Sequence, residues 1–327
     1  MNGLNTGIMG SGSYLPSKIL TNADLENMVE TSNEWIIERT GIRERRISEK
    51  NELNSDMAVQ AAKMALKNSN VNPEELDLII VSTITPDRLT PSTSCIVQGK
   101  LKAINAAAFD LSAACSGFIY ALTTAKAFIE SGNFNKVLVI GTEKLSSFVD
   151  WKDRSSCILF GDGAGAVVLS KNSEHSILNT YIRADGSESN LLRIPAGGSE
   201  LPIDEKQLLL RTNFLKMEGK ETFKLGVKSM TEAVLEVIHQ AKLSLSDIAL
   251  IIPHQANLRI IQAISDRLKF PSEKVFTNIE RCGNTSAASV AIAFDEVLKK
   301  QIIKKNDYIV LVAFGAGTTV ASLLLRW

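Results

Sequence analysis

The stretch DLIIVST at residues 77–83 is a short β-branched apolar run that ends in polar residues, which is typical of a buried parallel strand. The stretch DIALIIPH at residues 247–254 repeats that shape in the second half of the chain. Each run is followed by a cysteine and then by a glycine-rich segment, namely Cys115 and residues 159–169 after the first, and Cys282 and residues 313–320 after the second. This matching order predicts an internal duplication whose halves each alternate strands with helices, as in a layered α/β fold.

The join between the two halves is expected near residues 170–180, where the polar stretch NSEHS occupies residues 172–176. We therefore predict an N-terminal half at residues 1–174, which carries Cys115, and a C-terminal half at residues 175–327. Each half is expected to contribute a mixed sheet with helices, and the functional site is expected between them.

The glycine-rich segment GDGAG at residues 161–165 has neither the G-x-G-x-x-G nor the G-x-x-x-x-G-K-[ST] spacing of nucleotide-binding loops, and a strand rather than a helix is expected after it. We interpret it as a tight turn between paired strands, where glycine tolerates the positive φ that other residues resist. The segment FGAG at residues 314–317 is interpreted in the same way.

The composition excludes several classes of protein. The 327 residues are 45% hydrophobic, with no charged-then-apolar leader and no apolar run of about 18 residues, so we expect a soluble cytoplasmic protein without a membrane partner. Lysine plus arginine and aspartate plus glutamate each total 36, so the net charge gives no attraction to nucleic acid. The four cysteines form no C-x-x-C pair, which argues against a metal site and against a disulfide scaffold.

Cys115 is the first candidate for chemistry. It lies in SAACSG at residues 112–117, and apolar residues then continue at helical spacing to about Ile129. At a helix start, unpaired backbone N–H groups and the helix dipole favour the thiolate, which is the form that attacks acyl carbonyls. A buried structural cysteine is the alternative interpretation.

His254 and Asn284 occupy comparable positions in the second half. His254 follows the predicted strand, and strand ends are where open α/β sheets place ligands. Asn284 lies in RCGNTSAAS at residues 281–289, a loop that enters another apolar helix, where an asparagine is most often an N-cap. Because the duplication sets this loop opposite the Cys115 segment, a cysteine, a histidine and an asparagine are expected around one site.

At these residues the sequence resembles the β-ketoacyl-[acyl-carrier-protein] synthase III family, the initiating condensing enzymes of bacterial fatty acid synthesis, within the thiolase-like superfamily. The resemblance runs through nearly the whole chain and implies a thiolase-like α/β fold of two duplicated halves, assembled as a homodimer. It is carried by GSYLP at residues 12–16, NEWI at 33–36, RTGIRER at 39–45, FGDGAG at 160–165, PHQANLR at 253–259 and GNTSAAS at 283–289.

The resemblance implies that acyl-CoA loads Cys115, and that His254 and Asn284 assist decarboxylation of a malonyl group on acyl carrier protein. The products are a 3-oxoacyl carrier protein, CoA and carbon dioxide. Two neutral donors aimed at the thioester oxygen stabilise the enolate, whose charge appears only in the transition state. No cofactor beyond these thioester substrates is implied. The implied gate, which forms an oxyanion hole with the backbone N–H of Cys115, is Phe314, Gly315, Ala316 and Gly317.

Two sets of binding residues are also implied by the resemblance. An aromatic face with an arginine can hold an adenine, and arginines bind phosphates. The residues that match the coenzyme A tunnel are Trp35, Arg39, Arg154, Met217, Gly219, Phe223, Ala256 and Asn257. The residues that match the patch for the acidic carrier protein are Arg259, Lys224, Arg267 and Lys269.

Three positions depart from the family pattern. Thr90 stands where the family often has phenylalanine, at a position that lines the partner subunit's acyl pocket, so a longer or branched primer than acetyl is expected. Ala316 replaces the central glycine of a three-glycine turn, where a positive φ would now cost energy. Asp266 replaces a basic residue on the carrier-facing helix, which weakens the basic patch.

Other functions are distinguished by particular residues. A thiolase needs a second cysteine in the C-terminal glycine turn, which residues 314–317 lack, and an elongating synthase has a second histidine where this chain has Asn284. A starter-unit or ester-forming enzyme of secondary metabolism stays open. A papain-like peptidase would have a leader and a C-G-x-C-W context. A non-catalytic module that binds the carrier protein is disfavoured by the complete set of cysteine, histidine and asparagine.

Overall fold

The protein is a mixed α/β molecule, as predicted, and the computed structural model describes residues 6–171 and 174–327. The strands are β1 (Thr6–Tyr14), β2 (Ile19–Thr21), β3 (Glu44–Arg46), β4 (Leu78–Ser82), β5 (Ala107–Leu111), β6 (Lys136–Glu143), β7 (Gly163–Lys171), β8 (Ser176–Arg183), β9 (Leu192–Arg193), β10 (Lys216–Met217), β11 (Ile248–Pro253), β12 (Tyr308–Gly315) and β13 (Thr319–Arg326). The α-helices are α1 (Asn22–Glu26), α2 (Asn33–Thr40), α3 (Asn54–Ser69), α4 (Thr93–Leu101), α5 (Gly117–Glu130), α6 (Arg154–Cys157), α7 (Glu205–Leu209), α8 (Gly219–Gln240), α9 (Leu258–Leu268), α10 (Ile279–Cys282) and α11 (Ala288–Lys299).

The main sheet has two parts with the same internal order. Nine strands run in the order β11-β12-β13-β8-β1-β7-β6-β4-β5. In the first part β4 is parallel to β6, while β7 is antiparallel to β6 and β1. In the second part β11 is parallel to β12, while β13 is antiparallel to β12 and β8. The two parts meet where β1 pairs antiparallel with β8 at Gly7 and Ser176.

The shared order supports an internal duplication, and the predicted strands at residues 77–83 and 247–254 are confirmed as β4 and β11. The predicted α/β fold class with layered helices is confirmed as well. Of the polar join at residues 172–176, the first two positions lie outside the described residues. The division at residue 174 therefore stays a prediction.

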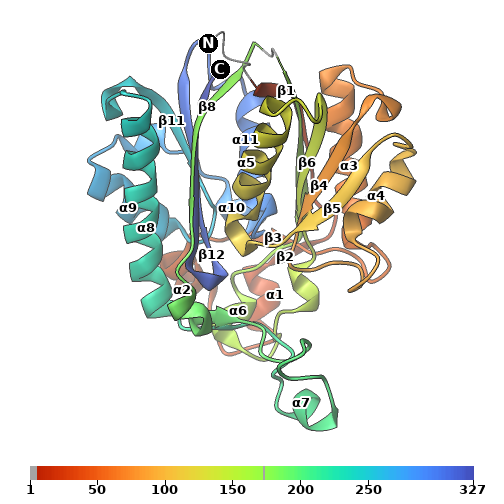
Figure 1. The fold of residues 1–327 in the computed structure, drawn as a ribbon. Helices are drawn as coiled ribbons and strands as arrows, with labels where there is room; N and C mark the ends of the chain where they lie inside the picture. The colour runs from red at the N-terminus through yellow and green to blue at the C-terminus, as the bar shows by residue number, and fades with distance from the viewer. Residues whose placement is uncertain (1–5, 172–173) are drawn as a thin grey trace.

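The layers explain why β4 is buried along its whole length and β6 from its second residue onward. Helices α5 and α11 lie between the two parts of the sheet, α3 and α4 cover the outer face of the first part, and α8 and α9 cover the outer face of the second (Figure 1). Every residue of β4 is buried, because helices pack on both of its faces. The carboxyl ends of the parallel strands and the starts of α5 and α11 therefore meet inside the molecule.

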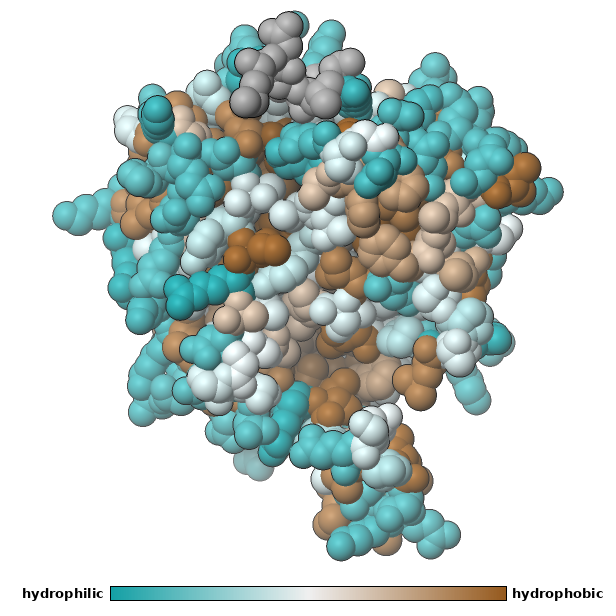
Figure 2. Space-filling view, in the orientation of Figure 1, coloured by the Kyte–Doolittle hydropathy of each residue, from teal (hydrophilic) through white to brown (hydrophobic). Residues whose placement is uncertain are grey.

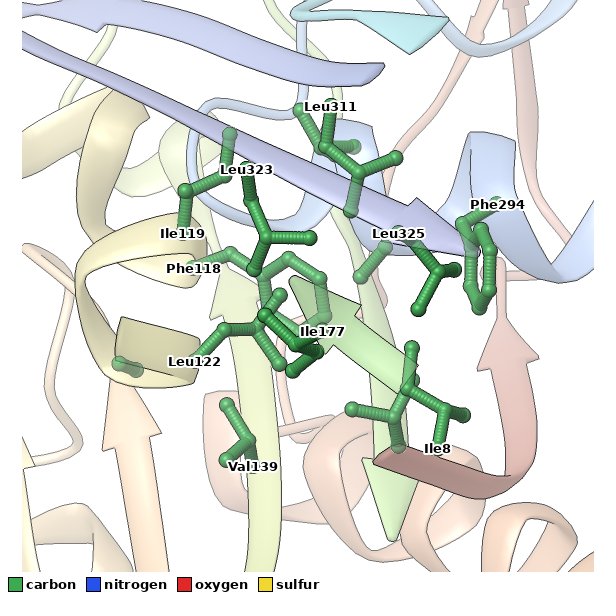
Figure 3. Close-up of a cluster of buried hydrophobic side chains, with 14 of the residues drawn as sticks. Ile8, Phe118, Ile119, Leu122, Val139, Ile177, Phe294, Leu311, Leu323 and Leu325 are labelled. Carbon is green, nitrogen blue, oxygen red and sulfur yellow. The ribbon is translucent and has the colours of Figure 1, made fainter. Parts of the chain in front are cut away.

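The central core joins both parts of the sheet. Phe118 of α5 and Phe294 of α11 are 1% and 0% exposed. They pack with Ile8 of β1, Val139 of β6 and Leu323 of β13 (Figure 3). Since burying a large apolar side chain is worth about 1.5–3 kcal/mol, this cluster holds the two central helices, and the loops that precede them, in fixed positions.

The interpretation of residues 161–165 as a tight turn is wrong. Gly163 and Gly165 lie within strand β7, and neither has a positive φ. A Cβ added at Gly165 would lie 2.5 Å from the Cβ of Ala291 in α11. The glycine is needed because the helix and the strand approach closely, so the sequence signal came from packing and not from backbone conformation.

A short segment around α7 projects from the body of the molecule (Figure 1). Its surface is apolar in part, as the brown side chains in Figure 2 show, and its exposed members are Ile203, Leu208, Leu209 and Leu210. Among residues 6–171 and 174–327, no helix combines the length and the apolar character that a membrane span requires.

Candidate active site

Cys115, His254 and Asn284 line one internal cavity of about 320 Å³. Cys115 lies in a 3₁₀ turn directly before α5, and His254 follows the last residue of β11. Asn284 lies in the loop between α10 and α11. The side chains are 7%, 2% and 7% exposed, so the three residues that the sequence predicted to converge do so in a site almost closed to solvent.

The resting state of Cys115 differs from the expectation of a thiolate. The pKa of the Cys115 thiol is raised to about 12, mainly by burial; the Ser286 side chain lowers it and the charge of the nearby Glu143 carboxyl raises it. The helix start is present, but loss of hydration and a like charge outweigh it. Cys115 is therefore a neutral thiol before substrate binds.

The turn at residues 314–317 packs directly on the Cys115 backbone. A Cβ added at Gly315 would lie 2.6 Å from the Cys115 nitrogen, so only glycine allows this approach. Thr319 Oγ1 donates to the carbonyl of Ala113 at 3.0 Å and ties the turn to the Cys115 segment. The expected strain at Ala316 is absent, because the positive φ angles of this turn fall at Gly317 and Thr318.

Burial determines the charge of His254, and a hydrogen bond to its ring holds its orientation. Burial lowers the pKa of the imidazole to about 3, so the ring is neutral at physiological pH. Nδ1 lies 2.6 Å from Ser289 Oγ, and the Gln255 backbone N–H points to the same oxygen at 3.4 Å. Either Nδ1 or Ser289 Oγ can donate in this bond, depending on the tautomer of the imidazole. In the tautomer in which the hydroxyl donates to Nδ1, the single ring proton lies on Nε2.

The interpretation of Asn284 as a helix N-cap is wrong, since α11 begins only at Ala288. The Asn284 side-chain oxygen accepts from the Ser286 backbone N–H at 2.9 Å, and its backbone N–H donates to Leu159 at 2.8 Å. With the oxygen held by its own loop, the amide NH₂ is the end that remains for a ligand.

The outer part of the cavity contains most of the predicted coenzyme A residues. Those in its wall are Trp35, Arg39, Met217, Gly219, Phe223, Ala256 and Asn257. Arg154 is not in the wall, but its guanidinium lies 4.9 Å from the centre of the Trp35 ring. An adenine held between the two side chains would have to displace Arg154 from this position.

The predicted carrier-protein residues lie outside the cavity. Arg259, in the first turn of α9, is exposed, and so are Lys224, Arg267 and Lys269. Lys224 pairs with Glu221 at 3.0 Å, and the exposed Asp266 precedes Arg267 in the chain. Lys224 and Arg259 are each next in sequence to a residue of the cavity wall, namely Phe223 and Ile260.

A second, apolar cavity of about 200 Å³ begins at Cys115. Its apolar members are Ile84, Ala114, Leu145, Phe160, Leu192, Ile194, Leu215 and Ala316. Thr90, the predicted acyl-pocket residue, is not in this wall and is exposed on the surface of its own chain.

Sequence reasoning missed three polar side chains of the site, namely Glu143, Ser286 and Ser289. Ser286 and Ser289 lie inside the GNTSAAS segment that was singled out for Asn284 alone. Glu143 ends the apolar strand β6, and an acidic residue at the carboxyl end of a buried strand was a signal that could have found it.

Comparison with known protein families gives a match to each of the two chain segments that carry the site residues. The family description "3-Oxoacyl-[acyl-carrier-protein (ACP)] synthase III" matches residues 109–186, which include Cys115. The description of the C-terminal part of the same family matches residues 238–327, which include His254 and Asn284.

Individual relatives match over almost the whole chain. A β-ketoacyl-[acyl-carrier-protein] synthase III of Caldanaerobacter subterraneus subsp. tengcongensis is 54% identical over 98% of this chain and 97% of its own. The crystal structure of a 3-oxoacyl-[acyl-carrier-protein] synthase III from Aquifex aeolicus matches with a TM-score of 0.91 and 50% identity, over 98% of this chain and all of that one. The priming β-ketosynthase of the R1128 polyketide pathway matches with a TM-score of 0.92 but 36% identity, over 100% and 98%.

Proposed function

The chain belongs to the 3-oxoacyl-[acyl-carrier-protein] synthase III family and is a condensing acyltransferase of fatty acid synthesis, and we propose that Cys115, His254 and Asn284 divide its reaction between them. Cys115 carries the primer acyl group. His254 and Asn284 act on the malonyl group. The observation that supports this division is their common cavity, in which the thiol and two neutral donors meet.

In the first half-reaction the Cys115 sulfur attacks the carbonyl of an acyl-CoA, and CoA leaves. The tetrahedral oxyanion is stabilised by the Cys115 backbone N–H and by an N–H of the turn that packs on it, with Ala316 as the donor of that turn. Phe314 lies beside this turn and in the cavity wall, where it gates access to the thiol. The acyl chain then occupies the apolar cavity behind Cys115.

In the second half-reaction malonyl carrier protein loses carbon dioxide, and the resulting enolate attacks the acyl group on Cys115. Nε2–H of His254 and the amide of Asn284 donate to the thioester oxygen, where negative charge develops. Because the pKa of His254 is about 3, the histidine acts as a neutral donor over the physiological range.

The two substrates enter through the same outer cavity. Trp35 with Arg154 and Arg39 binds the adenine and phosphates of coenzyme A, and Met217, Gly219, Phe223, Ala256 and Asn257 line the path of its pantetheine arm. Arg259 at the start of α9, with Lys224 and Arg267, meets the acidic carrier protein. The enzyme works in the cytoplasm, and it needs no cofactor besides these thioesters.

The working unit is a homodimer in which Thr90 reaches the partner subunit's acyl pocket. Leu89, beside Thr90, is 91% exposed, so a large apolar side chain lies on the surface next to this position. The apolar cavity of about 200 Å³ supports a primer longer than acetyl or branched, because one water needs only about 10–15 Å³ of such space.

A panel of acyl-CoA primers tests this function. The purified protein is incubated with acyl-CoAs from acetyl to decanoyl, including isobutyryl, and the mass added to the Cys115 peptide is measured. Short and branched acyl groups are expected on Cys115, and malonyl carrier protein is then expected to release a 3-oxoacyl carrier protein. Absence of label on wild-type protein, or equal label on Cys115→Ser, would contradict the assignment of the nucleophile.

A starter-unit enzyme of secondary metabolism is the second candidate, because the R1128 priming ketosynthase shares the fold at 36% identity. The higher identity to the fatty acid enzymes, 54% and 50%, favours the first. Presenting malonyl on a fatty acid carrier protein and on a polyketide carrier protein, with the same primer, separates the two candidates by the preferred partner.

A further inference from the structure

Glu143 is a fully buried carboxylate that the half-reactions above do not use. Its side chain is 0% exposed at the carboxyl end of β6. One oxygen accepts from Thr85 Oγ1 at 2.6 Å and from Thr83 Oγ1 at 3.1 Å, and the other accepts from Ser286 Oγ at 3.2 Å. The backbone N–H of Ile84 completes the set.

Neutral groups make up these partners. In the part of the chain that the structure describes, no lysine or arginine forms an ion pair with Glu143. The next residue, Lys144, directs its ammonium to the carbonyl of Glu52 at 2.6 Å. Burial without a cation raises the pKa of Glu143 to about 7, so this carboxyl can gain or lose a proton near neutral pH.

The titratable group that faces Glu143 is the Cys115 thiol, whose pKa the Glu143 charge raises. Ser286 adjoins both groups, because its hydroxyl donates to Glu143 at 3.2 Å and it lines the same apolar cavity as Cys115, where its side chain lowers the pKa of the thiol. Its backbone is held at a φ of 47°, in the left-handed region that side chains rarely adopt, and its N–H donates to Asn284. The loop therefore holds the hydroxyl in a fixed position.

We propose that Glu143, acting through Ser286, accepts the proton of Cys115 when the enzyme is acylated. This inference rests on the proposed role of Cys115 as the nucleophile. Glu143 is a positioning and proton-holding residue, since Ser286 separates it from the reacting atoms.

The proton balance follows from the hydrogen bonds. In the resting site Ser286 donates to the Glu143 carboxylate, and the proposed path requires the thiol to donate to Ser286 Oγ. On activation the S–H proton moves to Ser286 and the Ser286 proton moves to Glu143, so the sulfur keeps the electron pair with which it attacks the acyl carbonyl. The C–S bond to CoA then breaks, and the CoA thiolate recovers the proton by the reverse path. Glu143 ends as it began.

This path also removes the obstacle that the geometry creates. A thiolate next to an ionised Glu143 would place two negative charges in one buried site, and this repulsion adds to burial, the larger cause of the high pKa of Cys115. Once Glu143 is protonated, the site carries one charge, and the Ser286 hydroxyl donates to the thiolate. His254 is hydrogen-bonded to Ser289, on the other side of its ring from Nε2, and is kept for the malonyl group.

The test is the pH dependence of acylation in a single turnover. Wild-type acylation by butyryl-CoA, followed by mass spectrometry, is expected to rise with pH through about 7, as Glu143 loses its proton. Glu143→Gln and Ser286→Ala are expected to acylate roughly 100-fold slower, the lower end of the range for proton transfer, and to lose this rise. Ser286→Ala keeps the backbone N–H that holds Asn284, and Glu143→Asp is expected to restore part of the pH dependence.

Asp162 provides the matched control. It is a second buried carboxyl whose pKa burial raises, but it is bonded to Ser48 and Ser146. Asp162→Asn is expected to acylate with the wild-type rate and pH profile. Decarboxylation of malonyl carrier protein by acylated enzyme is expected to be unchanged in Glu143→Gln.

Three results would overturn the inference: a wild-type acylation profile in Glu143→Gln, fast acylation in Ser286→Ala, or equal losses in acylation and decarboxylation, which would indicate a merely structural role. Failure of the proposed function gives a different result, because Cys115→Ser would then still be acylated. If Cys115→Ser is inert and Glu143→Gln is normal, the proton path alone is wrong.

Discussion

Ser289→Ala is expected to slow decarboxylation without slowing acylation. Ser289 Oγ lies 2.6 Å from Nδ1 of His254, and both side chains are 2% exposed. When the hydroxyl donates to Nδ1, it keeps the single proton of the neutral ring on Nε2, the nitrogen proposed to donate to the enolate. Alanine leaves Nδ1 buried without this partner and allows the proton to settle on the wrong nitrogen.

The size of the effect follows from that single bond. An unsatisfied buried polar group costs about 1–3 kcal/mol. If the whole cost appears in the transition state, decarboxylation falls roughly 5-fold to 150-fold, since about 1.4 kcal/mol corresponds to tenfold in rate.

Two assays separate the half-reactions. Mass labelling of Cys115 by acyl-CoA measures acylation, and release of carbon dioxide from malonyl carrier protein measures decarboxylation by the acylated enzyme. Ser265→Ala is the control, because Ser265 is also buried and its hydroxyl donates to Phe270 at 2.7 Å, at the far end of α9. Wild-type decarboxylation in Ser289→Ala would refute the assignment of the His254 tautomer.

Three further predictions concern stability and primer choice. Gly165→Ala is expected to lower the melting temperature, because the added Cβ would lie 2.5 Å from the Cβ of Ala291 and overpacking costs about 1–3 kcal/mol. Gly99→Ala is the control: a Cβ added there meets no atom within 4 Å, and alanine is expected to stabilise helix α4. Glu143→Gln is expected to become more stable than wild type as pH rises from 4.5 to about 7, by up to roughly 3 kcal/mol in the free energy of unfolding measured with urea. The reason is that the carboxyl of the folded wild type holds its proton more tightly than that of the unfolded chain, so wild type loses stability over this range. A constant difference in stability between the two proteins would contradict the raised pKa. Ile194→Phe is expected to narrow the apolar cavity and shift labelling of Cys115 from branched to acetyl primers. Ile302→Phe, at an exposed position outside the wall of that cavity, is the control expected to leave the primer preference unchanged. An unaltered primer preference in Ile194→Phe would mean that the acyl chain lies elsewhere.

Much of the fold could be predicted because its signals are local. The runs at residues 77–83 and 247–254 have apolar centres because helices cover both faces of β4 and β11, and their repetition reflects the shared strand order. The prediction of a tight turn at residues 161–165 failed because a glycine in a sequence indicates only that a side chain is excluded at that position. Whether φ or a neighbouring helix excludes it depends on α11, more than a hundred residues away.

The three central residues of the candidate site could also be predicted from local signals. Cys115, His254 and Asn284 each stand at a strand end or helix start, so duplication alone brings them together. The state of Cys115 was not predictable, because it depends on how deeply the thiol is buried and on Glu143, a strand residue whose approach is set by packing. The placement of Arg154 over Trp35 likewise depends on tertiary contacts.

The division of labour between the thiol and the two neutral donors is tested most directly by following both half-reactions in His254→Ala and Asn284→Ala. The account predicts normal acyl label on Cys115 in both variants, with decarboxylation of malonyl carrier protein slowed roughly 100-fold to 1,000-fold, the loss expected for one oxyanion donor. Acylated variants that condense malonyl carrier protein at the wild-type rate would contradict it.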